Sequence, residues 1–262
     1  MKKDPHYLAG VYVLETEEIR VIETSPIQKI DHCLVGFPDV GLVGLIAVNH
    51  VINALGLTES GYIESDLLPP VIVVHQGDPK APIRIYSKNG LVIITSEIPI
   101  QPSIIPSLSR KIVEWTKTKG SQLLVTVSGI AVQDRLEIET PAVYGVASSP
   151  KTKDLLKKSD VNLLEEGFMV GIHASLLKDS AKSMVPAVIL MAQSHSEYPD
   201  PGAAASIVTA LNRLVNLNVD VKGLMEQAEE IRVRMRELMQ RTSKSMRGME
   251  KAQEQELPAM YV

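Results

Sequence analysis

Residues 32–55 read HCLVGFPDVGLVGLIAVNHVINAL, and this stretch decides the fold. Residues 32–37 are a short, largely apolar run, which is typical of a central parallel strand buried on both faces. Pro38 and Asp39 then form a turn, and residues 40–55 combine apolar side chains with small ones, which suits a helix packed closely on a sheet. The stretch therefore predicts a strand, a tight loop and a helix.

Strand-like runs recur on both sides of this unit, and the helices predicted between them alternate with these strands. Asn89-Gly90 is a hairpin signal between two of the runs. This alternation predicts a single α/β sheet domain over residues 1–218, with flanking helices and an inserted hairpin. The predicted strands are 9–14, 19–22, 62–64, 71–75, 83–86, 91–95, 123–127, 142–147 and 185–191, and the predicted helices are 106–119, 151–158 and 202–215.

The composition narrows the classes of function. The chain has 262 residues, 45% of them hydrophobic, and a net charge of -4, so it offers no basic field for nucleic acid or an anionic membrane. Cys33 is the one cysteine, which excludes an internal disulfide and is predicted to be a buried thiol. The N-terminal segment has no apolar run of signal-peptide length, and no apolar run of about 18 residues occurs elsewhere in the sequence. We therefore expect a cytoplasmic protein.

Three glycines punctuate the turn between the first buried strand and its helix. Gly36, Gly41 and Gly44 are spaced as Gly-x4-Gly-x2-Gly, which matches neither a dinucleotide fingerprint nor a phosphate loop. Asp39 stands in the same turn and would repel an anion. Two interpretations stay open: a ligand-binding turn made by Gly36, Asp39, Gly41 and Gly44, or tight packing of helix on sheet, which we favour. The dispersed histidines predict no metal site, and we expect neither a cofactor nor catalysis.

The helix predicted over residues 219–247 differs from the preceding domain. Leu224, Ile231, Met235 and Leu238 belong to a seam with spacings of three and four residues, as in a heptad pattern. The seam predicts either packing on the chain's own domain or contact with a neighbouring subunit or partner.

A tail is predicted after this helix, over residues 248–262. Gly248 and Pro258 are expected to end helical order, which would leave a flexible tether. The sequence closes with Met260, Tyr261 and Val262. This ending resembles the hydrophobic-Tyr-any motif by which activators and assembly factors dock between subunits of the proteasome α-ring.

The domain itself carries a second recognisable set of residues. They are Gly36 to Gly44 with Ala47, Asn49 and His50, then Ser128-Gly129, Gly167, Gly171, residues 199–204 and Val219-Asp220. With these residues the domain resembles the proteasome assembly chaperone 2 family in its archaeal form. That resemblance implies a fold similar to purine nucleoside phosphorylases, homo-oligomers and, in archaeal members, a proteasome-binding tail. Fold likeness to a phosphorylase does not imply its activity.

The two resemblances together predict a non-enzymatic, homo-oligomeric proteasome assembly chaperone or proteasome-binding factor. Met260 would fill an apolar pocket, Tyr261 would orient the tail by hydrogen bonding, and the Val262 carboxylate would pair with a basic group. Two alternatives remain: a nucleotide- or nucleoside-binding enzyme that uses the glycine turn, and a scaffold that acts through another adaptor protein.

Overall fold

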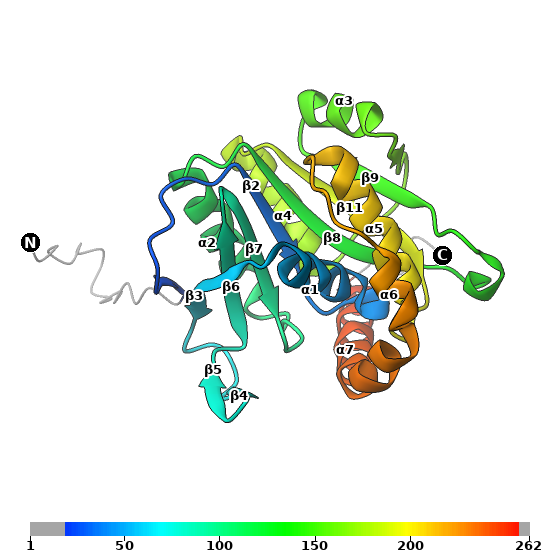
Figure 1. The fold of residues 1–262 in the computed structure, drawn as a ribbon, viewed down its shortest axis with the longest axis horizontal. Helices are drawn as coiled ribbons and strands as arrows, with labels where there is room; N and C mark the ends of the chain where they lie inside the picture. The colour runs from blue at the N-terminus through cyan, green and yellow to red at the C-terminus, as the bar shows by residue number, and fades with distance from the viewer. Residues whose placement is uncertain (1–18, 257–262) are drawn as a thin grey trace, which may run out of the picture.

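The computed structural model describes residues 19–256, and the side chains of residues 19–248. It has a large mixed sheet with helices on both faces (Figure 1). The predicted α/β class is confirmed. The predicted strand at 9–14 lies outside the described residues.

Nine strands form the main sheet, in the order β1-β3-β6-β7-β2-β8-β11-β9-β10. The four central strands β7, β2, β8 and β11 run parallel, and antiparallel pairs extend the sheet on both sides. Strands β4 and β5 make a separate small hairpin. The strands are β1 (Arg20–Glu23), β2 (His32–Gly36), β3 (Thr58–Glu64), β4 (Val73–His75), β5 (Asp78–Lys80), β6 (Ile83–Lys88), β7 (Leu91–Ser96), β8 (Leu123–Ala131), β9 (Val143–Ala147), β10 (Asn162–Leu163) and β11 (Ala187–Ser194).

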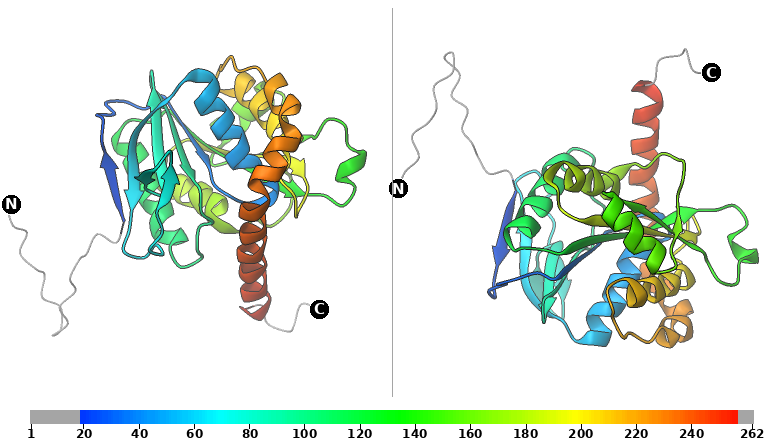
Figure 2. Two further views of the ribbon diagram at one scale, coloured as in Figure 1. Left: turned by 60° about the horizontal axis from the view of Figure 1, so that its bottom comes forward. Right: turned by 90° about the horizontal axis from the view of Figure 1, so that it is seen from above.

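Helices cover both faces of this sheet (Figure 2). Helices α1 and α5 pack together on one face, and α2 and α4 pack together on the other. Within the described residues, no helix combines the length and the apolar character needed to cross a membrane. The helices are α1 (Val43–Leu55), α2 (Ile105–Thr118), α3 (Pro150–Lys158), α4 (Gly171–Ser183), α5 (Pro201–Leu214), α6 (Lys222–Glu226) and α7 (Ala228–Glu256), with short 3-10 turns η1 (Val40–Leu42) and η2 (Arg135–Glu137).

Strand β2 shows why a continuous apolar run belongs at the centre of the sheet. Leu34 packs into the core under α1 and α5, whereas Cys33 and Val35 pack into the core under α2 and α4. Successive side chains of a strand point to opposite faces, so a strand covered on both faces needs apolar residues throughout. Cys33 is buried as predicted, and burial raises the pKa of its thiol.

The predicted hairpin at Asn89-Gly90 is confirmed between β6 and β7. Both residues have positive φ, 50° and 80°, which is the backbone geometry of a two-residue type I′ turn. Asparagine and glycine tolerate this left-handed conformation better than other residues. The local sequence therefore sets the register of the two strands.

The C-terminal helix differs from the prediction at both ends. It begins with the short α6 and restarts as α7 after Gln227, and α7 then continues through Gly248 to Glu256. The predicted end at Gly248 was wrong, because one exposed glycine costs a helix only about 1 kcal/mol. In Figure 2, α7 projects beyond the rest of the domain.

Candidate functional site

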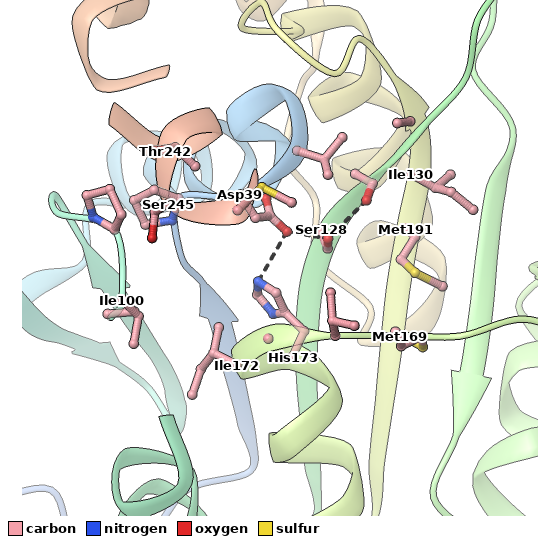
Figure 3. Close-up of a pocket in the computed structure, with 18 of the residues that line it drawn as sticks. Asp39, Ile100, Ser128, Ile130, Met169, Ile172, His173, Met191, Thr242 and Ser245 are labelled. Atoms are coloured by element: carbon pink, nitrogen blue, oxygen red, sulfur yellow. Dashed lines mark hydrogen bonds and ion pairs between the residues drawn. The ribbon is translucent and has the colours of Figure 1, made fainter. Parts of the chain in front are cut away.

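The candidate site lies at the middle of the sheet, between the neighbouring strands β2 and β8, whose following connections lead to opposite sides of the sheet. After β2 the chain builds the strands on one side, and after β8 it builds those on the other. Ligands of open α/β sheets bind at the carboxyl ends of strands at such a switch point. Asp39 follows β2 and Ser128 lies on β8, so the two residues meet there (Figure 3).

A cavity of about 230 Å³ opens at this edge. The amino end of α4 forms part of its wall, and residues of α7, including Thr242 and Ser245, form another part. Its surface is mainly apolar, with a few polar groups, as in many small-molecule sites. The apolar lining includes Ile100, Ile130, Met169, Ile172, Met191 and Met246.

Three polar side chains, those of Asp39, Ser128 and His173, converge at the wall of this cavity, and Thr126 lies behind them. The Ser128 hydroxyl donates to Asp39 Oδ2, and it also lies 3.1 Å from the carbonyl oxygen of Gly129. His173 Nε2 lies 3.3 Å from the same Asp39 Oδ2. On its other side, His173 Nδ1 is in hydrogen-bond contact with Thr126 Oγ1. The cluster joins β2, β8 and α4.

The order of these groups is not that of a nucleophilic triad. In a triad the histidine stands between the nucleophile and the carboxylate, so that it can take the nucleophile's proton. Here the Asp39 carboxylate stands between Ser128 and His173. Among the residues described, no group of His, Cys, Asp or Glu has the arrangement of a metal site. In this order Asp39 contacts both Ser128 and His173, and His173 is not placed to take the proton of Ser128.

Two buried polar atoms of the cluster have no hydrogen-bond partner within the described residues. They are Asp39 Oδ1 and His173 Nε2; the second of these makes no hydrogen bond, but it has the ion-pair contact of 3.3 Å with Asp39 Oδ2. Asp39 is 8% exposed and His173 is 5% exposed. Because a buried polar group without a partner is costly, such atoms often mark the position of a ligand or a bound water.

The three glycines of the turn serve close packing. A Cβ atom on Gly36 would lie 2.5 Å from the carbonyl oxygen of Gly44, and one on Gly44 would overlap the carbonyl oxygen of Val127. Gly41 has φ +61°, and a Cβ there would overlap the Ser194 hydroxyl. Of the four residues in the predicted ligand turn, Asp39 lines the cavity, whereas Gly36, Gly41 and Gly44 are not among the lining residues.

A buried ion pair fixes the neighbouring loop. Arg135 Nε lies 2.7 Å from Asp200 Oδ2, and Arg135 Nη2 lies 2.9 Å from Asp200 Oδ1. Asp200 also accepts a hydrogen bond from the Ala203 amide and so caps α5. Its pairing with Arg135 could not be predicted from local sequence, because the two residues are 65 positions apart.

The seam residues of the last helices contact the chain's own domain. Leu224 is buried, and Ile231, Met235 and Leu238 are partly buried against the core that includes α1 and α5. This packing favours the first of the two interpretations for these four residues. Their contact with a second subunit or a partner stays a prediction. Met260, Tyr261 and Val262 lie outside the described residues.

Sequence reasoning missed the roles of Thr126, Ser128 and His173. One signal was available: Thr126 and Ser128 are hydroxyl residues inside an otherwise apolar strand, β8. A polar residue on a strand buried on both faces needs a partner. His173 carried no such signal, because its contact with β8 arises only when α4 packs on the sheet.

Comparison with known proteins agrees with this open α/β sheet. The chain belongs to the PAC2 family, whose family model matches residues 33–239. An uncharacterised protein of Methanocaldococcus jannaschii is 29% identical over 231 residues, which are 88% of this chain and 94% of that protein.

Two solved structures from Pyrococcus furiosus are similar over most of the chain. PbaA, described as an archaeal homologue of proteasome-assembly chaperone, has a TM-score of 0.82 and 27% identity, covering 87% of this chain and 99% of that one. PbaB, described as an archaeal proteasome activator, has a TM-score of 0.71 and 20% identity, covering 85% and 99%. The likeness to PbaB shows the fold alone.

Proposed function

We propose that this protein is a non-enzymatic, homo-oligomeric proteasome assembly chaperone or proteasome-binding factor that docks C-terminal tails into pockets of the α-ring. The observation that carries the proposal is the match to PbaA, which combines 27% identity with a TM-score of 0.82 over 87% of the chain. Membership of the PAC2 family supports the same role. Such a role would place the protein in the cytoplasm.

The position of α7 supports tail docking. The helix projects from the domain, and its last residue, Glu256, precedes Val262 by six positions (Figure 2). Six residues span at most about 20 Å. The terminal residues are therefore tethered to a projecting helix, and their reach depends more on that helix than on a long flexible linker.

Docking by C-terminal tails becomes tighter when several tails of one oligomer bind at the same time. In the proposed complex Met260 fills an apolar pocket, Tyr261 orients the tail, and the Val262 carboxylate pairs with a basic group of the ring. One tripeptide binds weakly, but several tails on one oligomer raise the avidity by roughly 10² or more through effective concentration. The proposal therefore needs both a free tail and self-association.

The nucleotide-binding alternative is less well supported. Backbone amides that hold phosphate need open space at the glycine turn, whereas Gly36 and Gly44 are packed against backbone. The Asp39 carboxylate also lines the adjacent cavity and would repel phosphate. The scaffold alternative differs in its partner: it predicts that binding to the α-ring requires an adaptor protein.

Native mass spectrometry of the full chain mixed with purified proteasome α-subunits tests the proposal. We expect a complex that holds a ring of α-subunits and several copies of this chain. If the two proteins keep their separate masses, direct docking is wrong. If a complex forms only after an adaptor is supplied from a cell extract, the scaffold alternative is correct.

A further inference from the structure

The cavity at the switch point has the size of a small-ligand site. Its volume is about 230 Å³, whereas apolar cavities of about 150 Å³ already accept a benzene molecule. The helix α7 closes one side through Thr242, Ser245 and Met246. The described lining has room for one small molecule with an apolar body.

One side of the cavity offers a hydrogen-bond acceptor. Asp39 is the one acidic residue in the described lining, which includes neither Lys nor Arg. Its Oδ2 accepts a hydrogen bond from Ser128 and lies 3.3 Å from His173 Nε2, whereas its buried Oδ1 has no hydrogen-bond partner among the described residues. A ligand that carries an ammonium group would supply both a donor and the opposite charge.

Another side of the cavity offers the amino end of a helix. Gly171, Ile172 and His173, in the first turn of α4, line the cavity. No side chain caps this helix, because the residue before it is Val170. The first N–H groups of a helix lack partners within the helix and carry partial positive charge, so they attract a carboxylate.

His173 connects the Asp39 side of the cavity with the amino end of α4. Its backbone belongs to the first turn of α4, and its ring reaches to 3.3 Å from Asp39 Oδ2. The acceptor and the helix end are therefore separated by about the length of one side chain. This separation suits a molecule whose ammonium and carboxylate groups are close together.

We propose that the cavity binds a free apolar α-amino acid. Its ammonium group pairs with Asp39, its carboxylate lies at the amino end of α4, and its side chain packs among the isoleucine and methionine residues of the wall (Figure 3). The inference does not depend on a proteasome role, because none of these residues belongs to the tail.

Isothermal titration calorimetry of the full chain tests this site. The probes are L-leucine, L-methionine and L-phenylalanine, together with 3-methylbutylamine and 4-methylpentanoate, which are leucine without its carboxylate and without its amine. We expect L-leucine to bind with one site per chain, and each of its two analogues, which keep only one of its charged groups, to bind about tenfold more weakly or worse. Absence of binding by all three amino acids, or binding of either analogue as tight as that of leucine, would overturn the proposal.

Two variants test the assignment of the residues. Asp39→Asn should weaken binding of the amino acid by about tenfold or more, whereas Asp154→Asn, an exposed carboxylate on α3, should leave it unchanged. Ile130→Trp should block the cavity without touching the polar cluster. Circular dichroism confirms that each variant is folded. Unchanged binding in folded Ile130→Trp would contradict the assignment.

Discussion

The Asp39 carboxylate accepts a hydrogen bond from the Ser128 hydroxyl at the switch point between β2 and β8. Asp39 follows β2, whose connection leads to one side of the sheet, and Ser128 lies on β8, whose connection leads to the other. The bond therefore ties together the two halves of the fold at the rim of the cavity. Both residues are buried, so the bond is shielded from water.

Replacing Ser128 by alanine should destabilise the protein. Asp39 would lose the donor to its Oδ2, and a buried carboxylate that loses a donor costs about 1–3 kcal/mol of unfolding free energy. Urea denaturation monitored by circular dichroism measures the change. The exposed Ser103→Ala serves as the control, with an expected change within about 0.5 kcal/mol. Equal effects of the two variants would show that the bond contributes little.

The packing role of the glycine turn predicts opposite results at two glycines. Gly44→Ala should destabilise the fold by about 1–3 kcal/mol or more, because the new methyl group overlaps the Val127 carbonyl oxygen. Gly248→Ala, in α7 with open space around it, should stabilise that helix by up to about 1 kcal/mol. Thermal unfolding of both variants provides the comparison. Tolerance of alanine at Gly44 would contradict the packing interpretation.

The pair of Arg135 and Asp200 should show strong coupling in a double-mutant cycle. Arg135→Met leaves a buried carboxylate unpaired, and Asp200→Asn leaves a buried guanidinium unpaired although it keeps a helix cap. Each loss costs about 3–5 kcal/mol. The double variant should therefore lose much less than the sum of the single variants. The exposed pair of Arg213 and Asp160 is the matched control, with coupling below about 1 kcal/mol. Additive effects at Arg135 and Asp200 would contradict this account.

Stability should fall as the pH is lowered through the range in which histidines titrate. Burial lowers the pKa of His32, His75 and His195. The unfolded chain, with histidine pKa values of about 6.5, then binds more protons than the native state below that pH, so protonation favours unfolding. We expect a lower free energy of unfolding at about pH 5.5 than at pH 7.5, and a smaller difference in His32→Gln. An equal free energy of unfolding at pH 5.5 and pH 7.5 would contradict the lowered pKa values of these histidines.

The central part of the fold is predictable because local patterns decide it. The apolar run of β2 requires burial on both faces, Asn89-Gly90 requires a tight turn, and Asp200 caps the helix that starts beside it. The end of α7 was not predictable in the same way. Gly248 weakens the helix only slightly within its 29 residues, so the surrounding sequence outweighs the break that glycine suggests.

The site was only partly predictable, because it depends on contacts that are distant in the sequence. Asp39 was noticed as a carboxylate in a turn, but its partners come from β8 and α4. Thr126 and His173 are 47 positions apart, and Ser128 is 89 positions from Asp39. These residues come together only when the parallel strands and α4 pack, and no short sequence motif predicts their contacts.

Removal of Met260, Tyr261 and Val262 is the test of direct tail docking. The measurement is a pull-down of purified proteasome α-rings by the full chain and by the chain ending at Ala259, with the oligomer mass of both proteins determined in parallel. The shortened chain should keep its oligomer mass and lose binding to the ring. Unchanged capture of the ring by the shortened chain would contradict it.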